Sequence, residues 1–220
     1  MSVKENLVNI KNSLPAGVTL VAVSKTKPNA LIVEAYDAGQ RDFGENYVQE
    51  LVDKEVVLPK DIHWHFIGHL QSNKVKYIAP FVYLIHGVDS FKLLQEINKQ
   101  AEKNKRIITC LLQLYIAQED TKFGLSFEEC EDILNSDAFK NLKHIQIKGF
   151  MAMASNTSNE AQVEKEFRDL KTFADKISKS FFKIEVLSFG MSGDYQLAIN
   201  CGSTLVRIGS SIFGERSYPA

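Results

Sequence analysis

Residues 18–28 read VTLVAVSKTKP, an apolar run that leads directly into a loop containing a lysine. An uninterrupted apolar run of this kind is typical of a parallel strand that is buried on both faces. In an open, doubly wound sheet that binds a dinucleotide, the first strand would lead into a G-x-G-x-x-G turn. The loop here is SKTKP instead. We therefore favour a closed barrel over the doubly wound sheet, which is its main rival.

Outward from this stretch, short β-rich runs alternate with longer segments that have helical spacing of apolar residues. Strand, helix, strand repeated along one chain predicts a parallel sheet covered by helices, and about eight such units match a small (β/α)8 barrel. Helices are expected to begin after Ser90, Ser126 and Asp194, which are good N-terminal caps. The predicted strands are 18–23, 41–43, 63–67, 82–85, 106–114, 144–151, 184–187 and 204–208, and predicted helices include 91–103, 127–134, 160–178 and 195–199. We predict an α/β protein with one TIM-type barrel domain over residues 1–220.

The composition is that of a soluble globular protein, with 45% hydrophobic and 24% charged residues. Lys and Arg number 26 against 27 Asp and Glu, so the net charge is −1. That balance gives no basic surplus for nucleic acid or for an anionic membrane, and we expect neither as a partner. No apolar stretch approaches the length of a membrane span or a signal peptide. The three cysteines, Cys110, Cys130 and Cys201, fit no disulfide framework, so we expect a cytoplasmic protein.

Lys25 is the first candidate functional residue, because a barrel carries its active site at the carboxyl ends of its strands. Its stem would lie among apolar side chains, and partial desolvation there disfavours the ammonium form. The neutral amine that results can form a Schiff base with an aldehyde. Taken alone, the motif fits a solvated lysine at a strand end at least as well. Lys27, next to Pro28, is expected to be solvated in the loop.

The loops after the seventh and eighth predicted strands favour the functional interpretation, since phosphate often binds there in barrels. Residues 188–194 read SFGMSGD, and their small residues and the Ser192 hydroxyl lead into a helix start that attracts anions. Residues 208–214 read IGSSIFG. Gly209 lets the backbone approach a ligand closely, and Ser210 and Ser211 can donate to phosphate oxygens.

Arg207 interrupts the otherwise apolar eighth strand, and its charge is costly to bury without a partner. Alternation along a strand places Arg207 on the same face as Gly209, opposite to Val206 and Ile208. We expect the guanidinium to face into the barrel mouth, opposite a cofactor ring or an acidic group.

Six motifs in this order give the chain a family resemblance over nearly its whole length. They are VAVSKTKP (21–28), FGENYVQE (43–50), WHFIGHLQSNK (64–74), GFMAM (149–153), MSGDYxxAI (191–199) and VRIGSSIFG (206–214). Together they resemble the pyridoxal phosphate homeostasis protein family, whose members are stand-alone barrels related to the N-terminal domain of alanine racemase (fold type III). The resemblance implies that the cofactor is pyridoxal 5′-phosphate (PLP).

By this resemblance, Lys25 is the Schiff-base lysine and Arg207 the arginine that pairs with the pyridine nitrogen. Ser192 is implied as the phosphate-binding serine after the seventh strand, and Gly209 and Ser210 as the phosphate loop after the eighth.

The resemblance also implies that Asn46 lines the cofactor face. Met151 and Met153 fall where the barrel wall approaches the ring, although simple packing is an equally ordinary role for a methionine at a strand end. Phe189 departs from the methionine that is common in the family, which could shift the phosphate loop slightly.

The chemistry of PLP depends on how the protein treats its ring nitrogen. Arg207 would disfavour a protonated nitrogen and so weaken the ring as an electron sink. Alanine racemases also use a tyrosine from a second, dimer-forming domain, and the sequence ends at Ala220, so we expect neither that domain nor a dimer. We predict a monomeric carrier that buffers PLP on Lys25 and releases it to apo forms of PLP-dependent enzymes, without efficient turnover.

Three other functions remain open at this stage. A weak PLP-dependent amino-acid racemase would use the same residues. A metal-dependent hydrolase is suggested by His63 and His65, which face the same side of a strand as metal ligands can, with His69 nearby. However, no matching cluster of ligands appears at other strand ends, so we expect no metal. The third alternative is an interaction module that uses the barrel only as a scaffold.

Overall fold

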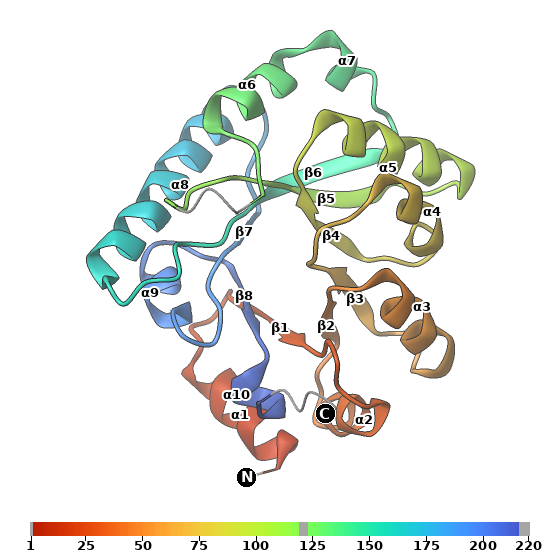
Figure 1. The fold of residues 1–220 in the computed structure, drawn as a ribbon, viewed down its shortest axis with the longest axis vertical. Helices are drawn as coiled ribbons and strands as arrows, with labels where there is room; N and C mark the ends of the chain where they lie inside the picture. Colours follow the sequence, from red (N-terminus) through yellow and green to blue (C-terminus); the bar gives the residue numbers. More distant parts are fainter. Residues whose placement is uncertain (1, 119–122, 216–220) are drawn as a thin grey trace.

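The protein is a closed barrel of parallel strands wrapped by helices, as the computed structural model describes it for residues 2–118 and 123–215 (Figure 1). In these residues, eight strands pair in chain order, and β1 closes the ring by pairing with both β2 and β8. The predicted TIM-type barrel is therefore confirmed. The strands are β1 (Thr19–Val23), β2 (Asp42–Glu45), β3 (His63–Phe66), β4 (Leu84–Val88), β5 (Ile108–Gln113), β6 (Ile145–Met151), β7 (Val186–Ser188) and β8 (Leu205–Ile208).

Helices connect successive strands and cover the outside of the ring (Figure 1). The α-helices are α1 (Val3–Ser13), α2 (Asn29–Asp37), α3 (Val48–Val57), α4 (Val75–Ile78), α5 (Phe91–Lys103), α6 (Phe127–Asn135), α7 (Asp137–Lys140), α8 (Glu160–Ser180), α9 (Tyr195–Asn200) and α10 (Ser210–Phe213), with a short 3₁₀ helix at Ser72–Lys74. No helix among the described residues is long and apolar enough to cross a membrane.

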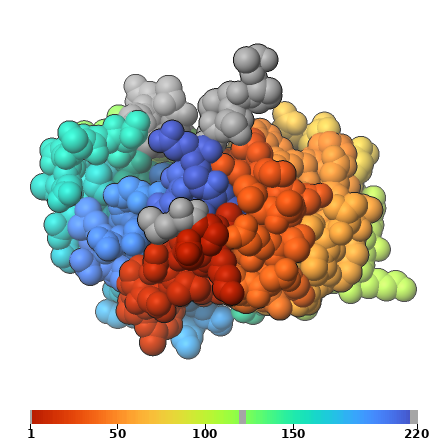
Figure 2. Space-filling view, turned by 90° about the horizontal axis from the view of Figure 1, so that it is seen from below, coloured from red at the N-terminus to blue at the C-terminus, as the bar shows by residue number. Residues whose placement is uncertain are grey.

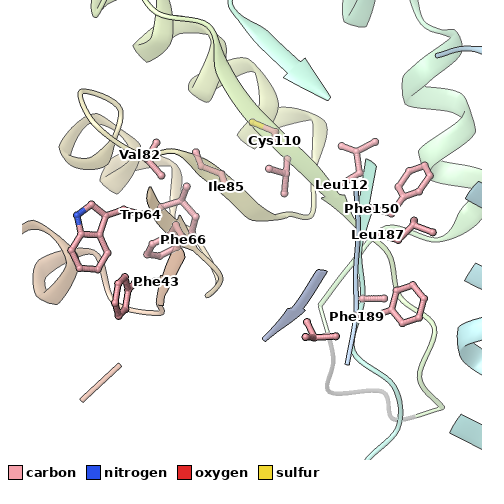
Figure 3. Packing of buried hydrophobic residues seen from close by; sticks show 14 of the residues in the cluster. Phe43, Trp64, Phe66, Val82, Ile85, Cys110, Leu112, Phe150, Leu187 and Phe189 are labelled. Atoms are coloured by element: carbon pink, nitrogen blue, oxygen red, sulfur yellow. The ribbon is translucent and has the colours of Figure 1, made fainter. Parts of the chain in front are cut away.

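The strand side chains alternate between two hydrophobic clusters. Those that face outward pack against the helices in one large cluster, in which Figure 3 shows Phe43, Trp64 and Phe66 on one side of the barrel and Phe150 and Phe189 on the other. Those that face inward form a smaller cluster inside the barrel, made of Val21, Leu84, Leu111, Met151 and Leu205. Because side chains fill the inside of the barrel, we expect a ligand to bind at the end of the barrel where the strands finish.

The other six strands match their predicted bounds to within two residues at each end, whereas β2 and β4 continue two and three residues past their predicted ends, through residues that include weak strand formers. β2 continues through Gly44, where a Cβ atom would lie 2.9 Å from Val21 Cγ1 and 3.0 Å from Ile67 Cδ1. β4 begins later than predicted and continues through His86 and Gly87. Gly44 is paired on both sides, with Val23 of β1 and His65 of β3. His86 and Gly87 instead lie where the register of β4 against β5 shifts, between Ile85 and Val88.

Ser90 and Ser126 cap α5 and α6 as predicted, and their side-chain oxygens accept from the N–H groups of Leu93 and Glu129. Asp194 precedes α9 but plays a different role, since its Oδ1 accepts instead from the N–H of Met191, 2.6 Å away. Its carboxylate therefore fixes the loop before the helix rather than the helix itself.

The first helix braces the end of the last barrel unit. Figure 2 shows the N-terminal segment against the C-terminal one, and Asn6 Nδ2 donates to the carbonyl of Ile212 in α10 over 3.1 Å. Because only Gly209 separates the end of β8 from the start of α10 at Ser210, this contact supports the segment that follows the last strand.

Candidate functional site

A cavity of about 310 Å³ opens at the carboxyl ends of β1, β2, β7 and β8. This volume lies at the small end of the range for pockets that hold cofactors. Its apolar lining comes from Val23, Ile67, Met153 and Met191, and its polar lining from Lys25, Lys27, Asn46, Ser192, Arg207 and Ser210, with Gly193, Gly209 and Gly214 completing the wall. Segments almost the whole chain apart therefore share one pocket.

Lys25 is half-buried at the tip of β1 and lines this cavity. The backbone around it is held tightly: the N–H of Ser24 donates to the carbonyl of Gly44, and the N–H of Lys27 donates to the carbonyl of Ser24. Thr26 has a φ of 62°, which is unfavourable for a β-branched residue. Such a conformation persists only where the surroundings enforce it, and it is typical of functional loops.

A buried ionic cluster enforces that backbone from the side of α3. Lys54 Nζ donates to the carbonyl of Ser24 (2.8 Å), to Glu45 Oε1 (2.8 Å) and to Glu50 Oε1 (2.6 Å). Glu50 Oε1 in turn accepts from the N–H of Thr26 over 2.6 Å. The backbone on both sides of Lys25 is therefore tied to one helix, a support that the sequence interpretation missed.

Glu45 is the most buried member of this cluster. Burial raises the pKa of its carboxyl to about 7, although Lys54 and the Ser24 hydroxyl, which donates to Oε1 over 2.5 Å, oppose the shift. The second oxygen, Oε2, has no hydrogen-bond partner among the described residues. The carboxyl thus titrates close to neutral pH directly behind the Lys25 loop.

The opposite wall of the cavity is built from the loops after β7 and β8. The N–H of Gly209 points at Ser192 Oγ, 3.4 Å away, so the two loops meet at these residues. Gly190 has a φ of +96°, and a Cβ there would lie 2.6 Å from the Cβ of Ala198. Glycine is therefore required at this turn, which delivers Ser192 to the cavity.

Arg207 faces into the barrel beneath the cavity, as the alternation along β8 predicts, and is only 4% exposed. Its Nη1 donates to the carbonyl and the hydroxyl of Ser188, each 2.6 Å away, and its Nη2 donates to the carbonyl of Ala152 over 3.0 Å. Burial lowers the pKa of Arg207 to about 10, against the favourable charge of Asp194. The guanidinium therefore remains cationic at neutral pH.

Six of the seven residues singled out from the sequence line this cavity: Lys25, Asn46, Ser192, Arg207, Gly209 and Ser210. The Oδ1 atom of Asn46 is buried and has no hydrogen-bond partner in the described part of the chain. An unsatisfied buried acceptor is costly, and a ligand donor in the cavity would satisfy it.

Met151 lies elsewhere. It is 1% exposed and packs among the apolar side chains inside the barrel, whereas Met153, two residues further along, lines the cavity. Both side chains face inward, but Met151 lies one layer deeper. Alternation along a strand predicts whether a side chain faces into the barrel or out of it, but it does not predict how deep inside the barrel the side chain lies.

Lys27 also differs from the expectation of a solvated lysine. It is half-buried, it lines the cavity, and its Nζ donates to the carbonyls of Phe213, Gly214 and Glu215 at the end of α10. A cation at a helix C-terminus is favourable there. The Lys27 contacts tie the first loop of the barrel to the last.

His63 and His65 both approach Asp42 Oδ1, at 3.2 and 3.0 Å. Among the described residues, no group of three or more His, Cys, Asp or Glu side chains is arranged to hold a metal ion.

Comparison with known proteins agrees with this architecture. The model of the alanine racemase N-terminal domain family matches residues 1–217. An alanine racemase of Clostridium difficile has the same fold (TM-score 0.82) at 16% identity, and the match covers 100% of this chain and 57% of that one.

Closer relatives match along their whole length. PipY of Synechococcus elongatus is 35% identical over 97% of this chain and 100% of its own, with a TM-score of 0.92 for the structure without PLP. A second structure of PipY, described as having PLP bound, gives a TM-score of 0.89.

Two curated relatives are named pyridoxal phosphate homeostasis protein. That of Pasteurella multocida is 38% identical over an alignment of 233 positions, which covers 99% of this chain and 99% of its own. That of Escherichia coli is 38% identical over 208 residues, covering 93% of this chain and 88% of its own. The barrel, the cavity at its mouth and these matches together show that this chain belongs to the pyridoxal phosphate homeostasis protein family.

Proposed function

We propose that this protein binds PLP covalently on Lys25 and holds it for intracellular PLP homeostasis, without efficient catalytic turnover. The observation that carries the proposal is the meeting, in one cavity, of Lys25 with Arg207 and with the two small-residue loops that contain Ser192 and Gly209. Barrels commonly bind phosphate in those two positions. The PLP described in the structure of PipY supports the identity of the ligand.

The residues present fit this cofactor. PLP supplies an aldehyde, with which a neutral lysine amine condenses with loss of water to form a carbon–nitrogen double bond. The hydroxyls of Ser192 and Ser210, which line the cavity, can donate to a phosphate. Met153 and Ile67 offer apolar contact to a ring, and the unsatisfied Oδ1 of Asn46 offers an acceptor.

Arg207 supports the part of the proposal that concerns turnover. A guanidinium beside a pyridine nitrogen disfavours its protonation, and an unprotonated ring is a weak electron sink. The contacts of Arg207 with Ser188 and Ala152 keep that cation in the wall of the cavity. The role that remains for the protein is to bind PLP, to orient it and to release it.

Reduction with borohydride tests the covalent site. We expect the wild-type protein incubated with PLP to gain one cofactor mass that peptide mapping assigns to Lys25 rather than Lys27. Lys25→Ala should lose the gain, and Lys76→Ala, on the exposed surface, should keep it. A reduced adduct on Lys27, or none on the wild type, would contradict the proposal.

The absence of turnover has its own test. Incubating the PLP-loaded protein with L-alanine in deuterated water should leave the α-hydrogen unexchanged over the time in which a racemase would exchange it. Deuterium entering that position at enzyme-like rates would favour the racemase alternative. Delivery to apo-enzymes, a cytoplasmic location and a monomeric state complete the proposed role, and light scattering measures the last of these.

A further inference from the structure

A chain of hydrogen-bonded side chains crosses the inside of the barrel behind the cavity. It begins at Asp42 on β2, whose Oδ1 lies 3.0 Å from His65 Nε2. His65 Nδ1 lies 2.8 Å from His86 Nε2 on β4, and His86 Nδ1 lies 2.9 Å from Ser188 Oγ on β7. Ser188 Oγ accepts from Arg207 Nη1 over 2.6 Å, which brings the chain to the cavity.

The middle of this chain is fully enclosed. His86 and Ser188 are 0% exposed and His65 is 1% exposed, while Asp42 is half-buried at the other end of the barrel. Burying three polar side chains is costly unless each finds a partner, and here every ring nitrogen of both histidines has one. A core built only for stability would use apolar side chains in these positions.

The chemistry of the two ends determines where each proton lies. The pKa of Asp42 is lowered, because hydrogen bonds to His65 and His63 outweigh its burial, so its carboxylate accepts from His65 Nε2–H. Burial lowers the pKa of His65 despite Asp42, and lowers that of His86 well below its usual value, so both rings are neutral. The Nδ1 atom of His65 is then an acceptor, and the Nε2–H of His86 must donate to it.

The same argument reaches Arg207. Since Nδ1 of neutral His86 carries no proton, the Ser188 hydroxyl must donate to it, and Oγ is left to accept from Arg207. Every donor in the chain therefore points from Arg207 toward Asp42. Aligned hydrogen bonds of this kind strengthen one another and present their negative ends to the buried cation. Among the described residues no carboxylate contacts Arg207 directly, so the chain links its charge to that of Asp42.

We propose that Asp42, His65, His86 and Ser188 are positioning residues for Arg207, which hold its guanidinium in one orientation and one charge state toward the ring of the bound cofactor. The inference rests on the proposed function, because Arg207 meets a cofactor ring only if PLP binds in the cavity. It assigns a role to the two buried histidines of the barrel interior, His65 and His86.

Nitrogen-15 NMR of the histidine side chains tests the chain in the protein without PLP. We expect both His65 and His86 to be neutral at neutral pH, with the proton on Nε2. Ser188→Ala should move the signal of His86 Nδ1 toward that of an unbonded nitrogen and leave His65 unchanged. A proton on Nδ1 of either ring, or a doubly protonated ring, would overturn the proposal.

The effect on the cofactor is measured in PLP-loaded variants. Asp42→Ala and Ser188→Ala should shift the absorption band of bound PLP and weaken its binding by roughly fivefold, the effect of losing one hydrogen bond of ordinary net strength. His63→Gln is the matched control, since His63 also contacts Asp42 but its side chain is 45% exposed and lies outside the hydrogen-bonded chain. This variant should leave the absorption band and the PLP affinity unchanged.

Wild-type absorption bands and affinities in both Asp42→Ala and Ser188→Ala would overturn the positioning role. Failure of the wild-type protein to take up PLP would instead refute the proposed function, while the NMR measurement would still show whether the chain orders its protons as inferred.

Discussion

Met151 and Met153 differ by two positions along the same part of the chain but have different surroundings. Met151 is enclosed by Val21, Leu84, Leu111 and Leu205, while Met153 is half-buried in the cavity wall. A side chain that only packs and a side chain that touches a ligand should respond differently to truncation. The two methionines, one at the end of β6 and one just after it, therefore allow effects on stability and on binding to be measured separately.

We expect Met151→Ala to cost about 2–5 kcal/mol of unfolding free energy, the usual range for opening a cavity in a core. It should leave the PLP affinity of the folded protein nearly unchanged. Met153→Ala should do the reverse and weaken PLP binding several-fold with little loss of stability. Chemical denaturation and PLP titration measure the two quantities, and a larger binding defect in Met151→Ala would contradict this assignment.

Glu45 is the residue whose charge state should make stability depend on pH near neutrality. Its pKa is about 7 in the folded protein against an ordinary value of 4.5, so the folded state binds the proton more tightly than the unfolded state. The resulting stabilisation is fully present below pH about 4.5 and is lost as the pH rises through about 7.

Glu45→Gln should therefore flatten the fall in unfolding free energy between pH 5 and pH 8, by up to a few kcal/mol. Gln keeps an oxygen that can accept from Ser24 and Lys54. Urea unfolding at several pH values measures the slope, with Glu102→Gln on the exposed surface as the control. A variant that keeps the wild-type slope would show that Glu45 is ionised throughout this range.

At the scale of the element, the loop between β7 and α9 contains two glycines with different requirements. Gly190 has a positive φ and lies against Ala198 and Tyr195, whereas an added Cβ at Gly193 would meet nothing within 4 Å. The loop is further held by Asp194, which accepts from the N–H of Met191.

Gly190→Ala should lower the melting temperature and displace Ser192 from the cavity, because both the backbone conformation and the space there exclude a Cβ. Gly193→Ala should leave the free energy of unfolding within about 0.5 kcal/mol of the wild-type value, as a surface change does. Calorimetry of the two variants checks this, and equal destabilisation would argue that loop flexibility rather than steric fit sets the effect.

Elements with local signals were predictable from the sequence, and elements decided by their neighbours were not. The capping serines Ser90 and Ser126 mark their helices, because a cap acts within one turn. Lys25 and Arg207 could be placed at the cavity because strand ends and alternating faces follow from the pattern alone. By contrast, the strand character of Gly44 depends on β1 and β3, which pair with it on either side and which no local pattern records.

At the scale of the whole molecule, the polar chain inside the barrel was also beyond sequence reasoning. His63 and His65 were noticed as a pair, but Asp42, His86 and Ser188 lie on three other strands. Their meeting depends on the tilt and stagger that closure of the barrel imposes. The ionic cluster around Lys54 is similar, since a lysine in an amphipathic helix gives no sign that it will reach the loop after β1.

The closure itself is uneven around the ring. β2 and β3 are in register over four residue pairs, whereas β7 and β8 share a single pair, Ser188 with Leu205. The cavity lies above this weak part of the barrel, with Lys25 on the β1 side and Ser192 and Gly209 on the β7 and β8 side. A ligand that contacts Lys25 as well as Ser192 and Gly209 would therefore connect β1 to β7 and β8.

PLP should stabilise the barrel where it is weakest. We expect hydrogen exchange to slow on PLP binding at the amides of β7 and β8 more than at those of β4 and β5, because ligand binding raises the free energy of the openings that release it. The Lys25→Ala variant, which lacks the connection through β1, should show much less of this protection at equal PLP concentration. Protection confined to the cavity loops, with β7 and β8 unchanged, would mean that the cofactor sits on the barrel without holding it closed. Equal protection in all strands would instead indicate that the barrel opens only as a whole, so that its uneven pairing has no consequence for how PLP is kept.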